Sequence, residues 1–459
     1  MFTDLERPDP ITEMPVNKTS KNAAIEIVRT LRRHRHEALF AGGCVRDMLL
    51  GRRPSDFDVA TSARPREVER LFDRTVAVGK AFGVIRVRLH GHEVEVATFR
   101  AEGAYLDGRR PSSVKFTTSR EDAERRDFTI NGLFYDPIRR EVLDFTGGRR
   151  DLRRRVLRAI CDPSARFRED HLRLLRCVRF AAQLDFKIET RTWRAVVKMA
   201  PRIRGVSAER VRDELSKLLT APHAAKGLRL LQRSGLMRVL LPEIEVMRGV
   251  AQPRQHHPEG DVFVHTLRVV GNLRKPDTAL AWSALLHDVA KPPTFEKALV
   301  RGRVRIRFPE HARLGAEMAE KILRRLRFSN AEREAVVAMV ANHMTFKDVK
   351  AMRLSTLKRL LARPTFESEL KLHHADCSAC HGKLGNVTFL KRRQREMPVA
   401  EIRPPRLISG RDLIEIGLKP GPEFGRILAD VEEAQLEGKV TTRAQALEMA
   451  SVQGRPNQS

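Results

Sequence analysis

The stretch LFAGGCVRDMLLGRRPSDFDVAT, residues 39–61, decides how the first part of the chain folds. It predicts an apolar strand, a turn at Gly42 and Gly43, a short helix, and a second strand that carries Asp56 and Asp58. Because side chains alternate along a strand, the two carboxylates are expected on one face, where together they can hold cations. Glycines at a strand-to-helix turn let backbone N–H groups approach a phosphate, and the helix N-terminus adds partial positive charge. The stretch therefore indicates nucleotide chemistry.

Beyond this stretch, the pattern of apolar residues divides the chain into a strand-rich part and a helical remainder. Residues 21–33 show helical spacing, strands and turns dominate residues 38–144, and nearly every segment after Phe145 is helical. We therefore expect a multidomain protein with a small mixed α/β head, an all-α neck, a further α-helical domain and a helical tail. The expected boundaries are a flexible arm at 1–20, the head at 21–150, the neck at 151–245, the helical domain at 246–385 and the tail at 386–459.

The composition is strongly basic, with 87 Lys and Arg residues against 58 Asp and Glu and a formal charge of +29. Such an excess points to a polyanionic partner, either a nucleic acid or an anionic membrane. Because only two Trp and two Tyr are present, phosphate contacts with a structured RNA are favoured over base stacking on many aromatic rings. No stretch has the length and apolar character of a membrane helix or a secretion signal, so we expect a cytoplasmic protein without a membrane partner. The five scattered cysteines indicate reduced thiols.

Glu95 is the candidate for a third acidic group beside Asp56 and Asp58. It lies in the segment EVEVATFR, residues 93–100, which is expected to form a neighbouring strand. A buried, unpaired carboxylate is costly, so three carboxylates on adjacent strands favour a site for two Mg²⁺ ions, one that activates a 3′-hydroxyl and one that is bound to a triphosphate. The alternative is that Glu95 is an ordinary exposed position on a strand.

The segment RRDFTIN, residues 125–131, supplies a second set of candidates. Asp127 and Asn131 are expected one turn apart on a helix that faces the nucleotide, where a carboxylate can accept a hydrogen bond from a ribose 2′-hydroxyl. Arg126 is then placed to bind phosphate. Taken alone, Arg125 is better explained as a charged residue at the edge of a helix or strand than as a binding residue.

Residues 167–186, FREDHLRLLRCVRFAAQLDF, are expected to form one helix that carries a third set. Asp170 and Arg173 are three residues apart and therefore share a face of that helix. Such a pair usually lies on the surface without a function. A fixed acceptor beside a fixed donor nevertheless matches the edges of cytosine and adenine and rejects uracil and guanine. Arg176 and Arg179 on the same helix are further candidates for nucleotide binding.

Taken in this order, the motifs resemble those of the class II tRNA nucleotidyltransferases, the CCA-adding enzyme family, which includes bacterial poly(A) polymerases. The resemblance covers residues 39–219. The opening stretch is similar to the family's metal-binding motif, RRDFTIN to its ribose-selecting motif, and residues 168–180 to the motif that templates the incoming base. DFTGGRRDL, residues 144–152, resembles the hinge between head and neck, and SAERVRDELSKLL, residues 207–219, resembles the last motif, a neck helix capped by Ser207.

The resemblance implies a template-independent nucleotidyltransferase that adds or repairs the 3′-terminal CCA of tRNA. Its implied substrates are the tRNA 3′ end, CTP and ATP, and its implied cofactor is Mg²⁺. The implied catalytic carboxylates are Asp56, Asp58 and Glu95, with the two aspartates as the Mg²⁺ ligands. The implied nucleotide-binding residues are Gly42, Gly43, Arg46, Arg126, Asp127, Asn131, Asp170, Arg173, Arg176 and Arg179.

Two segments bear on which member of the family the chain is. Residues 99–116 correspond to a flexible loop that lets these enzymes switch from CTP to ATP, and here the loop has its full length. Residues 79–87, GKAFGVIRV, differ from the GRRFRLAHV-like stretch that poly(A) polymerases of the family tend to carry. The full-length loop implies that ATP addition is retained, since members that add only CC have a shortened loop, and the second segment favours CCA addition over poly(A) synthesis. An enzyme that adds only A, or a poly(A) polymerase, remains the alternative.

A second group of candidates consists of histidines and aspartates in the helical domain. They are His265, His287, Asp288, His311, His343 and Asp376. A lone histidine on an apolar helix is usually a core residue, but an adjacent His-Asp pair at the end of an apolar helix is a sharper signal. Separate helices that each bring an imidazole or a carboxylate into a bundle core can bind a divalent metal.

This pattern resembles the HD phosphohydrolase domain that some bacterial members of the family append. By this resemblance the core metal ligands are His265, His287, Asp288 and Asp376, with His311 and His343 as additional ligands of a site with two metals. The identity of the metal stays open, and 2′,3′-cyclic phosphates or phosphomonoesters are the implied substrates. Two rivals to CCA addition follow: an HD-type hydrolase whose head only grips RNA, and a basic RNA-binding protein without catalysis.

The remaining motifs concern haem and the tRNA backbone. Residues 377–381, CSACH, spell the c-type haem attachment pattern, but they lie in the helix expected to carry Asp376, so helix packing is expected and haem is not. The arginine clusters at 147–158, 320–328 and 389–395 would ordinarily be solvated faces. The charge balance makes some of them a track for the tRNA backbone. The oligomeric state is left open.

Overall fold

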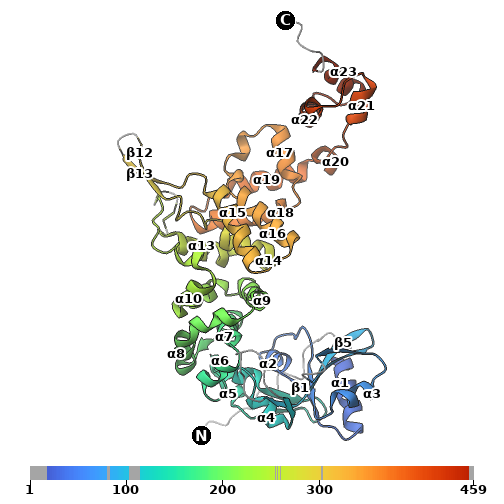
Figure 1. Cartoon of the computed structure of the whole chain (residues 1–459), viewed down its shortest axis with the longest axis vertical. Coiled ribbons are helices and arrows are strands. Elements are labelled where there is room, and N and C mark those ends of the chain that lie inside the picture. The colour runs from blue at the N-terminus through green and yellow to red at the C-terminus, as the bar shows by residue number, and fades with distance from the viewer. Residues whose placement is uncertain are drawn as a thin grey trace, which may run out of the picture. The chain divides into compact units, whose positions relative to one another are not determined.

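The structure is a computed structural model that describes residues 18–79, 83–102, 114–253, 255, 257–258, 260–300 and 303–453. The chain splits into two compact units, Met1–Pro242 and Glu243–Ser459, whose helices and strands are labelled in Figure 1. Several predictions fall outside the described residues: most of the arm at 1–20, residues 80–82 of the GKAFGVIRV segment, and residues 103–113 of the loop at 99–116.

A seven-stranded mixed sheet forms the centre of the first unit, with the strand order β3-β4-β5-β2-β1-β8-β9. Its strands are β1 (Ala38–Ala41), β2 (Val59–Thr61), β3 (Thr75–Gly79), β4 (Val84–Leu89), β5 (His92–Thr98), β8 (Leu133–Asp136) and β9 (Glu141–Asp144). Strands β2 and β5 run parallel, and the other neighbouring pairs are antiparallel. The apolar strand β1 is buried along its whole length because it lies in the interior of the sheet.

Short helices and a small second sheet surround these strands. The helices are α1 (Lys18–Arg33), α2 (Gly43–Leu49), α3 (Pro65–Leu71) and α4 (Ser119–Glu124), and the second sheet pairs β6 (Arg100–Glu102) with β7 (Val114–Phe116). Helix α1, predicted over residues 21–33, packs on β1 and β5 with a buried face that includes Ala24, Ile27 and Val28. Helix α2 follows β1 directly and contacts β1 and β8.

The rest of the first unit is mainly helical. Its helices are α5 (Gly148–Arg154), α6 (Pro163–Glu169), α7 (Leu172–Leu184), α8 (Thr190–Met199), α9 (Ala208–Leu219), α10 (Ala224–Ser234) and α11 (Leu236–Leu240). A short parallel pair, β10 (Val156–Leu157) with β11 (Lys187–Ile188), lies among them. Helix α7 packs against both α9 and α10, so it stands at the centre of this helical part.

The predicted continuous helix over residues 167–186 is wrong. The backbone leaves the helical conformation at Asp170, with φ −139° and ψ 105°. The Oδ1 atom of Asp170 instead accepts a hydrogen bond of 3.0 Å from the backbone N–H of Leu172. Such a local side-chain bond competes with a continued helix, and α7 begins anew after it. Ser207 occupies the N-cap position of α9 as predicted, but its side chain makes no capping hydrogen bond.

The second unit, in the part that the structure describes, contains helices and an antiparallel hairpin. Its helices are α13 (Val262–Asn272), α14 (Thr278–Leu286), α15 (His311–Arg325), α16 (Asn330–Asn342), α17 (Leu354–Leu361), α18 (Phe366–Ala379), α19 (Gly385–Glu396), α20 (Val399–Ile402), α21 (Gly410–Glu415), α22 (Pro422–Leu436) and α23 (Arg443–Gln453), while α12 (Pro242–Glu245) lies at the boundary between the units. Helix α14 contacts α13, α16 and α18 and buries every residue from Leu280 to Leu286.

An antiparallel hairpin, β12 (Glu296–Val300) with β13 (Arg303–Arg307), interrupts the nearly all-helical pattern expected after the head. This hairpin projects from the helices of the second unit (Figure 1). Apart from the two short strand pairs, the expected architecture of a mixed α/β head followed by helices is confirmed. Within the residues that the structure describes, no helix has the length and apolar character needed to cross a membrane.

Candidate functional sites

The glycine turn after β1 and the helix that follows it contact the second predicted motif, RRDFTIN at residues 125–131. Gly42 has φ +72°, and a Cβ atom at this position would lie 2.9 Å from Nη1 of Arg126. Glycine therefore fits both the backbone conformation and the available space. The helix that follows carries Arg46, which is 5% exposed. Its Nη1 atom donates a 2.9 Å hydrogen bond to Oδ1 of Asn131.

The three candidate carboxylates meet where β2 begins. Val59 in β2 pairs with Val96 in β5, and the two strands run parallel. The residues that precede them, Asp58 and Glu95, therefore lie side by side. The prediction that Asp56 and Asp58 lie inside a strand is wrong, because the ladder to β5 begins only at Val59. All three carboxylates still line one cavity of about 940 Å³.

These carboxylates repel one another. Burial, and after it the charges of Asp56 and Glu95, raise the pKa of Asp58 to about 6. A cation would relieve this repulsion, and carboxylate oxygens are the ligands that Mg²⁺ prefers. The side chains therefore fit a Mg²⁺ site. Glu95 is half-exposed and also pairs with Arg86 at 3.4 Å, so it lies at the edge of the group.

The carboxylate of Asp127 is fully engaged. Its Oδ1 atom accepts hydrogen bonds from the backbone N–H of Phe128 at 2.8 Å and from Nδ2 of Asn131 at 3.0 Å. Its Oδ2 atom accepts two from Arg176, from Nε at 2.9 Å and from Nη2 at 2.7 Å. Burial alone would raise the pKa of Asp127, but the charge of Arg176 and the bond from Asn131 lower it to about 2.

The predicted helix that would place Asp127 and Asn131 one turn apart is wrong. Phe128 is extended and forms a β-bridge with Ala159, so the chain cannot be helical at that point. A single 3₁₀ turn, Thr129–Asn131, follows. This turn nevertheless brings the two side chains within hydrogen-bond distance.

Asp170 and Arg173 line the same cavity, but each is held by a different partner. The Oδ2 atom of Asp170 accepts a 2.7 Å hydrogen bond from Nη2 of Arg210 on α9. Nη1 of Arg173 donates to Oε2 of Glu169 at 2.6 Å, and its Nη2 donates to the backbone oxygen of Arg125 at 3.1 Å. The predicted shared face of one helix is wrong, because the helix breaks between the two residues.

A phenylalanine that the sequence did not single out organises the arginines of the site. The guanidinium carbons of Arg46, Arg176 and Arg179 lie 5.3, 5.2 and 3.7 Å from the centre of the Phe180 ring. Cations are attracted to the face of an aromatic ring. Arg179 also donates a hydrogen bond to the buried carboxylate of Glu214. Phe180 therefore gathers positive charge where a triphosphate would need it.

Sequence reasoning also missed Asp122, which supports two arginines. Its carboxylate is buried and lies 2.6 Å from Nη2 of Arg125 and 2.9 Å from Nη2 of Arg126. Burial acts to raise the pKa of Asp122, but the two guanidinium groups hold it below its ordinary value. The spacing of three and four residues along α4 was the signal that could have revealed this pairing.

The structure brings all the predicted residues of the head to one cavity. These residues are Gly42, Gly43, Arg46, Asp56, Asp58, Glu95, Arg126, Asp127, Asn131, Asp170, Arg173, Arg176 and Arg179. Further residues that line the cavity are Arg100, Arg125, Phe180, Gln183, Arg210 and Lys217. The carboxylates, the arginines and the ribose and base candidates therefore share a single space.

The histidines and aspartates predicted in the second unit also come together. They lie on, or at the ends of, helices α13, α14, α15, α16 and α18. Asp288 stands between two groups of possible ligands: His265 and His287 on one side, and His311 and His343 on the other. In each group the ligand atoms lie within 4.8 Å of one another.

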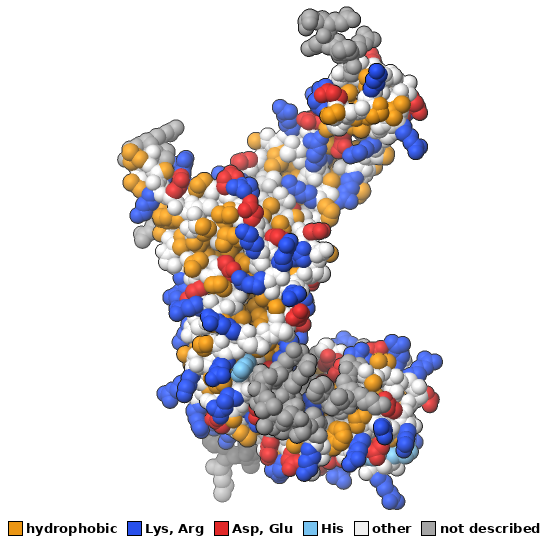
Figure 2. Space-filling view, viewed as in Figure 1, with side chains coloured by type: hydrophobic (Ala, Val, Ile, Leu, Met, Phe, Trp, Pro, Cys, Tyr) orange, Lys and Arg blue, Asp and Glu red, His pale blue; other side chains and the backbone are white. Residues whose placement is uncertain are grey.

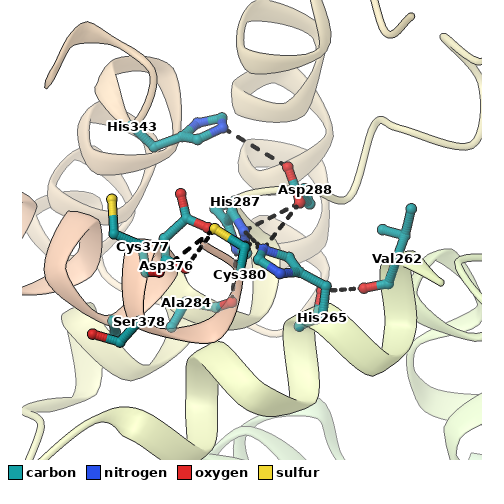
Figure 3. Close-up of polar contacts among 12 residues, drawn as sticks. Val262, His265, Ala284, His287, Asp288, His343, Asp376, Cys377, Ser378 and Cys380 are labelled. Carbon is teal, nitrogen blue, oxygen red and sulfur yellow. Dashed lines mark hydrogen bonds and ion pairs between the residues drawn. The ribbon is translucent and has the colours of Figure 1, made fainter. Parts of the chain in front are cut away.

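Individual distances show how the two groups share one carboxylate (Figure 3). Oδ2 of Asp288 lies 3.2 Å from Nε2 of His287 and 3.7 Å from Nε2 of His265. Oδ1 of Asp288 lies 3.7 Å from Nε2 of His311 and 3.8 Å from Nε2 of His343. Asp376 joins the first group, with its Oδ1 atom 3.0 Å from Nε2 of His265.

The charges in this cluster suit a metal. Burial lowers the pKa of His343 to about 4 and also lowers the pKa of His311. Burial acts to raise the pKa of Asp288, but His287 and Lys291 hold it well below its ordinary value. Neutral imidazole nitrogens with carboxylate oxygens are a donor set for divalent transition metals. The residues therefore fit the metal that the HD-like pattern implies.

A cavity of about 860 Å³ opens at this cluster. It is lined by Asp288, His311, His343 and Asp376, and also by both thiols of the CSACH segment, Cys377 and Cys380. Cys377 lies in helix α18 together with Asp376, as predicted. Cys380 follows the helix and donates a 3.2 Å hydrogen bond to the backbone oxygen of Asp376. The thiols thus form part of the cavity wall as well as packing against the helix.

Positive side chains are widely spread over the surface. Figure 2 shows Lys and Arg over the visible face of each unit, with Asp and Glu among them. The predicted cluster at residues 147–158 contributes exposed arginines on α5, including Arg149, Arg150, Arg153 and Arg154. Whether this cluster follows a tRNA backbone stays a prediction.

Comparison with protein-family models gives three matches. The Poly A polymerase head domain matches residues 38–158, the Probable RNA and SrmB- binding site of polymerase A matches residues 185–247, and the tRNA nucleotidyltransferase domain 2 putative matches residues 311–450.

Curated proteins named CCA-adding enzyme are similar to the chain. That of Anoxybacillus flavithermus is 43% identical over 48% of this chain and 55% of its own length, so the chain matches about half of that relative. Those of Streptococcus mutans and Bacillus velezensis are 30% and 33% identical, each over 92% of this chain and 95% of its own length.

Solved structures agree with these matches. The CCA-adding enzyme of Bacillus stearothermophilus in complex with CTP is 28% identical, with a TM-score of 0.74 over 95% of this chain and 98% of its own. The CCA-adding enzyme of Thermotoga maritima complexed with tRNA_CCA is 19% identical, with a TM-score of 0.58 over 96% of this chain and 97% of its own, which shows a common fold. The third family match, over residues 311–450, overlaps the latter part of the predicted helical domain at residues 246–385.

Proposed function

Because the chain belongs to the CCA-adding enzyme family, we propose that it is a template-independent nucleotidyltransferase that adds or repairs the 3′-terminal CCA of tRNA from CTP and ATP. The observation that carries the proposal is that carboxylates, arginines and the ribose and base candidates line one cavity of about 940 Å³. A cavity of this size can take a nucleoside triphosphate. Action in the cytoplasm is part of the same proposal.

Nucleotidyl transfer requires a 3′-hydroxyl to attack the α-phosphate of a bound triphosphate. Asp56, Asp58 and Glu95 would hold Mg²⁺ beside that phosphate, since they line one side of the cavity. When bound, Mg²⁺ supplies activation of the hydroxyl and neutralisation of phosphate charge. Arg46 and Arg126, at the glycine turn, would hold the triphosphate itself.

The base and the ribose would be selected by separate groups. Asp170 can accept a hydrogen bond from the exocyclic amino group of cytosine or adenine, and Arg173 can donate to the neighbouring ring nitrogen. Uracil and guanine would place donor against donor and acceptor against acceptor, which leaves buried polar groups unpaired. Near the ribose, Asp127 and Asn131 would recognise the 2′-hydroxyl.

The test is to incubate the pure protein with Mg²⁺, labelled CTP or ATP, and tRNA that ends before, within or after CCA. We expect C to be added before A, and addition to stop once CCA is complete. Absence of incorporation on every acceptor would overturn the proposal. Addition of A alone would identify an A-adding enzyme, and long A tracts on unrelated RNA would identify a poly(A) polymerase.

We propose a second activity for the other unit, metal-dependent hydrolysis of phosphoesters. The observation that favours it is the pair of three-ligand groups that share Asp288. Two nearby divalent cations can stabilise both the attacking and the leaving oxygen of a phosphoester. Replacing His287 and Asp288 by Ala should remove this hydrolysis and leave nucleotide addition intact.

The two rivals make different predictions in the same assays. A hydrolase whose head only grips RNA would release phosphate but incorporate no nucleotide. A basic protein that only binds RNA would do neither. Loss of both activities in the double variant would mean that the two units do not act independently.

A further inference from the structure

Glu214 lies behind the cavity of the first unit and faces two of the arginines that line it. It is carried by α9, is 4% exposed, and does not line the cavity itself. Its Oε2 atom accepts a hydrogen bond from Nε of Arg179, and its Oε1 atom lies 3.6 Å from Nη1 of Arg176. A buried carboxylate is costly unless it is paired, so Glu214 depends on these two cations.

Arg176 stands between two carboxylates. Its Nε and Nη2 atoms donate to Oδ2 of Asp127, whereas its third nitrogen, Nη1, lies toward Glu214. Burial acts to lower the pKa of Arg176, but the charges of Asp127 and Glu214 raise it above its ordinary value. The separation of 3.6 Å from Glu214 is longer than a hydrogen bond. Arg176 is therefore bonded to Asp127 and has Glu214 as a second acceptor close by.

A ribose 2′-hydroxyl that binds Asp127 must take a position that another donor now occupies. The donors to this carboxylate are the backbone of Phe128, the side chain of Asn131, and Arg176. Asn131 is buried and is itself held by Arg46. The side chain of Arg176 is 31% exposed. Arg176 is therefore the donor that has room to leave.

The surroundings of Arg176 limit where it can go. Its guanidinium carbon lies 5.2 Å from the centre of the Phe180 ring, and that of Arg179 lies 3.7 Å from the same centre. Arg179 is buried and also donates a 2.7 Å hydrogen bond from Nη1 to Oε1 of Gln183. Arg179 is thus fixed, and Arg176 can turn toward Oε1 of Glu214. A shift of roughly 0.7 Å would bring Nη1 to an ordinary hydrogen-bond distance of about 2.9 Å.

We propose that Glu214 is a positioning residue for ribose recognition. It receives Nη1 of Arg176 when a ribose 2′-hydroxyl takes the place of that arginine on Asp127, and it keeps the charge of the arginine paired inside the site. The proposal rests on the nucleotidyltransferase activity proposed above and gives a residue outside the cavity a part in it. A deoxyribonucleotide has no 2′-hydroxyl, so it would leave Arg176 on Asp127.

The experiment compares CTP with dCTP in the full chain with Mg²⁺, on tRNA that ends after the first C of CCA. Glu214→Gln keeps the size of the side chain but removes its charge, so Arg176 stays more tightly on Asp127. We expect kcat/KM for CTP to fall by about ten-fold, mainly through a higher KM. The value for dCTP should change by less than about two-fold, because that substrate does not compete with Arg176.

Asp213→Asn is the matched control, because Asp213 precedes Glu214 on α9 but is exposed and pairs with Arg212 at 2.8 Å. It should leave both values within about two-fold of the wild type. Equal losses for CTP and dCTP in Glu214→Gln would overturn the proposal and make Glu214 a structural residue of the neck. An unchanged ratio of the two values would overturn it as well.

A double-mutant cycle tests whether the effect passes through Asp127. In an Asp127→Asn background, Glu214→Gln should change the ratio of CTP to dCTP by less than about two-fold. A ten-fold change that persists in this background would contradict the proposed route.

Failure to fold and failure of the activity can both be told apart from failure of this inference. If thermal unfolding shows that Glu214→Gln is not folded, Glu214→Asp takes its place, since it keeps the charge and withdraws the carboxylate by one methylene group. It should lower the ratio by about three-fold, and an unchanged ratio would overturn the proposal. If the wild type adds no nucleotide, the proposed activity is wrong, and CTP and dCTP are titrated into each protein by calorimetry. A weaker preference for CTP in the Glu214 variant would then support the proposal, and an unchanged preference would overturn it.

Discussion

Arg176 and Asp127 are joined by two hydrogen bonds, from Nε and Nη2 of the guanidinium to the single oxygen Oδ2 of the carboxylate. The other oxygen already accepts from Phe128 and Asn131. A carboxylate has about four acceptor positions, and here all four are used. A ribose 2′-hydroxyl can therefore bind Asp127 only when one of these donors moves, and Arg176, which is partly exposed, is the donor with room to do so.

The first prediction concerns the pH dependence of stability. The pKa of Asp127 is lowered from 3.8 to about 2, so its ionised form stabilises the folded state. This contribution is fully present above the unfolded-state value and is lost as the pH falls through the folded-state value. We expect the free-energy difference between wild type and Asp127→Asn to shrink by about 2 kcal/mol from pH 5 to pH 2. Urea unfolding followed by circular dichroism measures it, and parallel pH profiles would contradict it.

The second prediction separates two glutamates on the same strand. Glu95→Gln should lower kcat of nucleotide addition by about a hundred-fold and weaken Mg²⁺ binding, because Glu95 lines the cavity beside Asp58. Glu93→Gln is the control, since Glu93 lies on the same exposed face of β5 and pairs with Arg88 at 2.6 Å, whereas Glu95 lines the cavity. It should leave both quantities within about two-fold. Equal effects of the two changes would mean that Glu95 is an ordinary exposed position on the strand and does not bind Mg²⁺.

The third prediction concerns Arg210, a positioning residue for base selection. Arg210→Ala removes the hydrogen bond that holds Oδ2 of Asp170, so the preference for CTP over UTP should fall by about ten-fold. Arg212→Ala is the matched control, because Arg212 lies on the same helix but pairs with its neighbour Asp213 at 2.8 Å. Incorporation of each nucleotide on the same acceptor measures the ratio. An unchanged ratio with uniformly slower addition would indicate a merely structural role.

The fourth prediction concerns the stoichiometry of the histidine cluster. If Asp288 is shared by two groups of ligands, wild-type protein should bind about two divalent cations at this cluster. His343→Ala removes a ligand of one group only and should leave about one cation, whereas Asp288→Asn should leave none. Elemental analysis after dialysis measures the content, with Asp56→Asn and Asp58→Asn in each protein to exclude the head. A single cation in wild type would contradict the shared arrangement.

The sequence predicted the residues of the site better than the backbone that carries them. The motifs are short and contiguous, so the identity of each side chain is visible even where its local structure is misjudged. Asp56 and Asp58 were expected inside a strand, and Asp170 within a helix. The spacing of apolar residues could not reveal where the strand begins or where the helix breaks. The strand begins where Val59 pairs with Val96. The helix breaks where the side chain of Asp170 accepts a hydrogen bond from the backbone N–H of Leu172.

Partners that are distant in the sequence could not be predicted. Arg210 lies forty residues from Asp170, and Glu214 lies thirty-five from Arg179, so only the packing of α7 on α9 brings them together. The hairpin β12–β13 is a different case. Its second strand, RVRIR, alternates apolar and charged residues, which is a strand signal that the surrounding helices obscured.

The parallel pairing of β2 with β5 has a consequence for how the protein can fail. Asp58 and Glu95 face each other only because Val59 is in register with Val96. A slip of one residue would turn Glu95 to the other side of the sheet and at the same time bring the buried side chains of Val94 and Val96 to the exposed face. The register that assembles the acidic group is therefore the same register that buries the core, so a molecule that folds stably also carries Asp58 and Glu95 together.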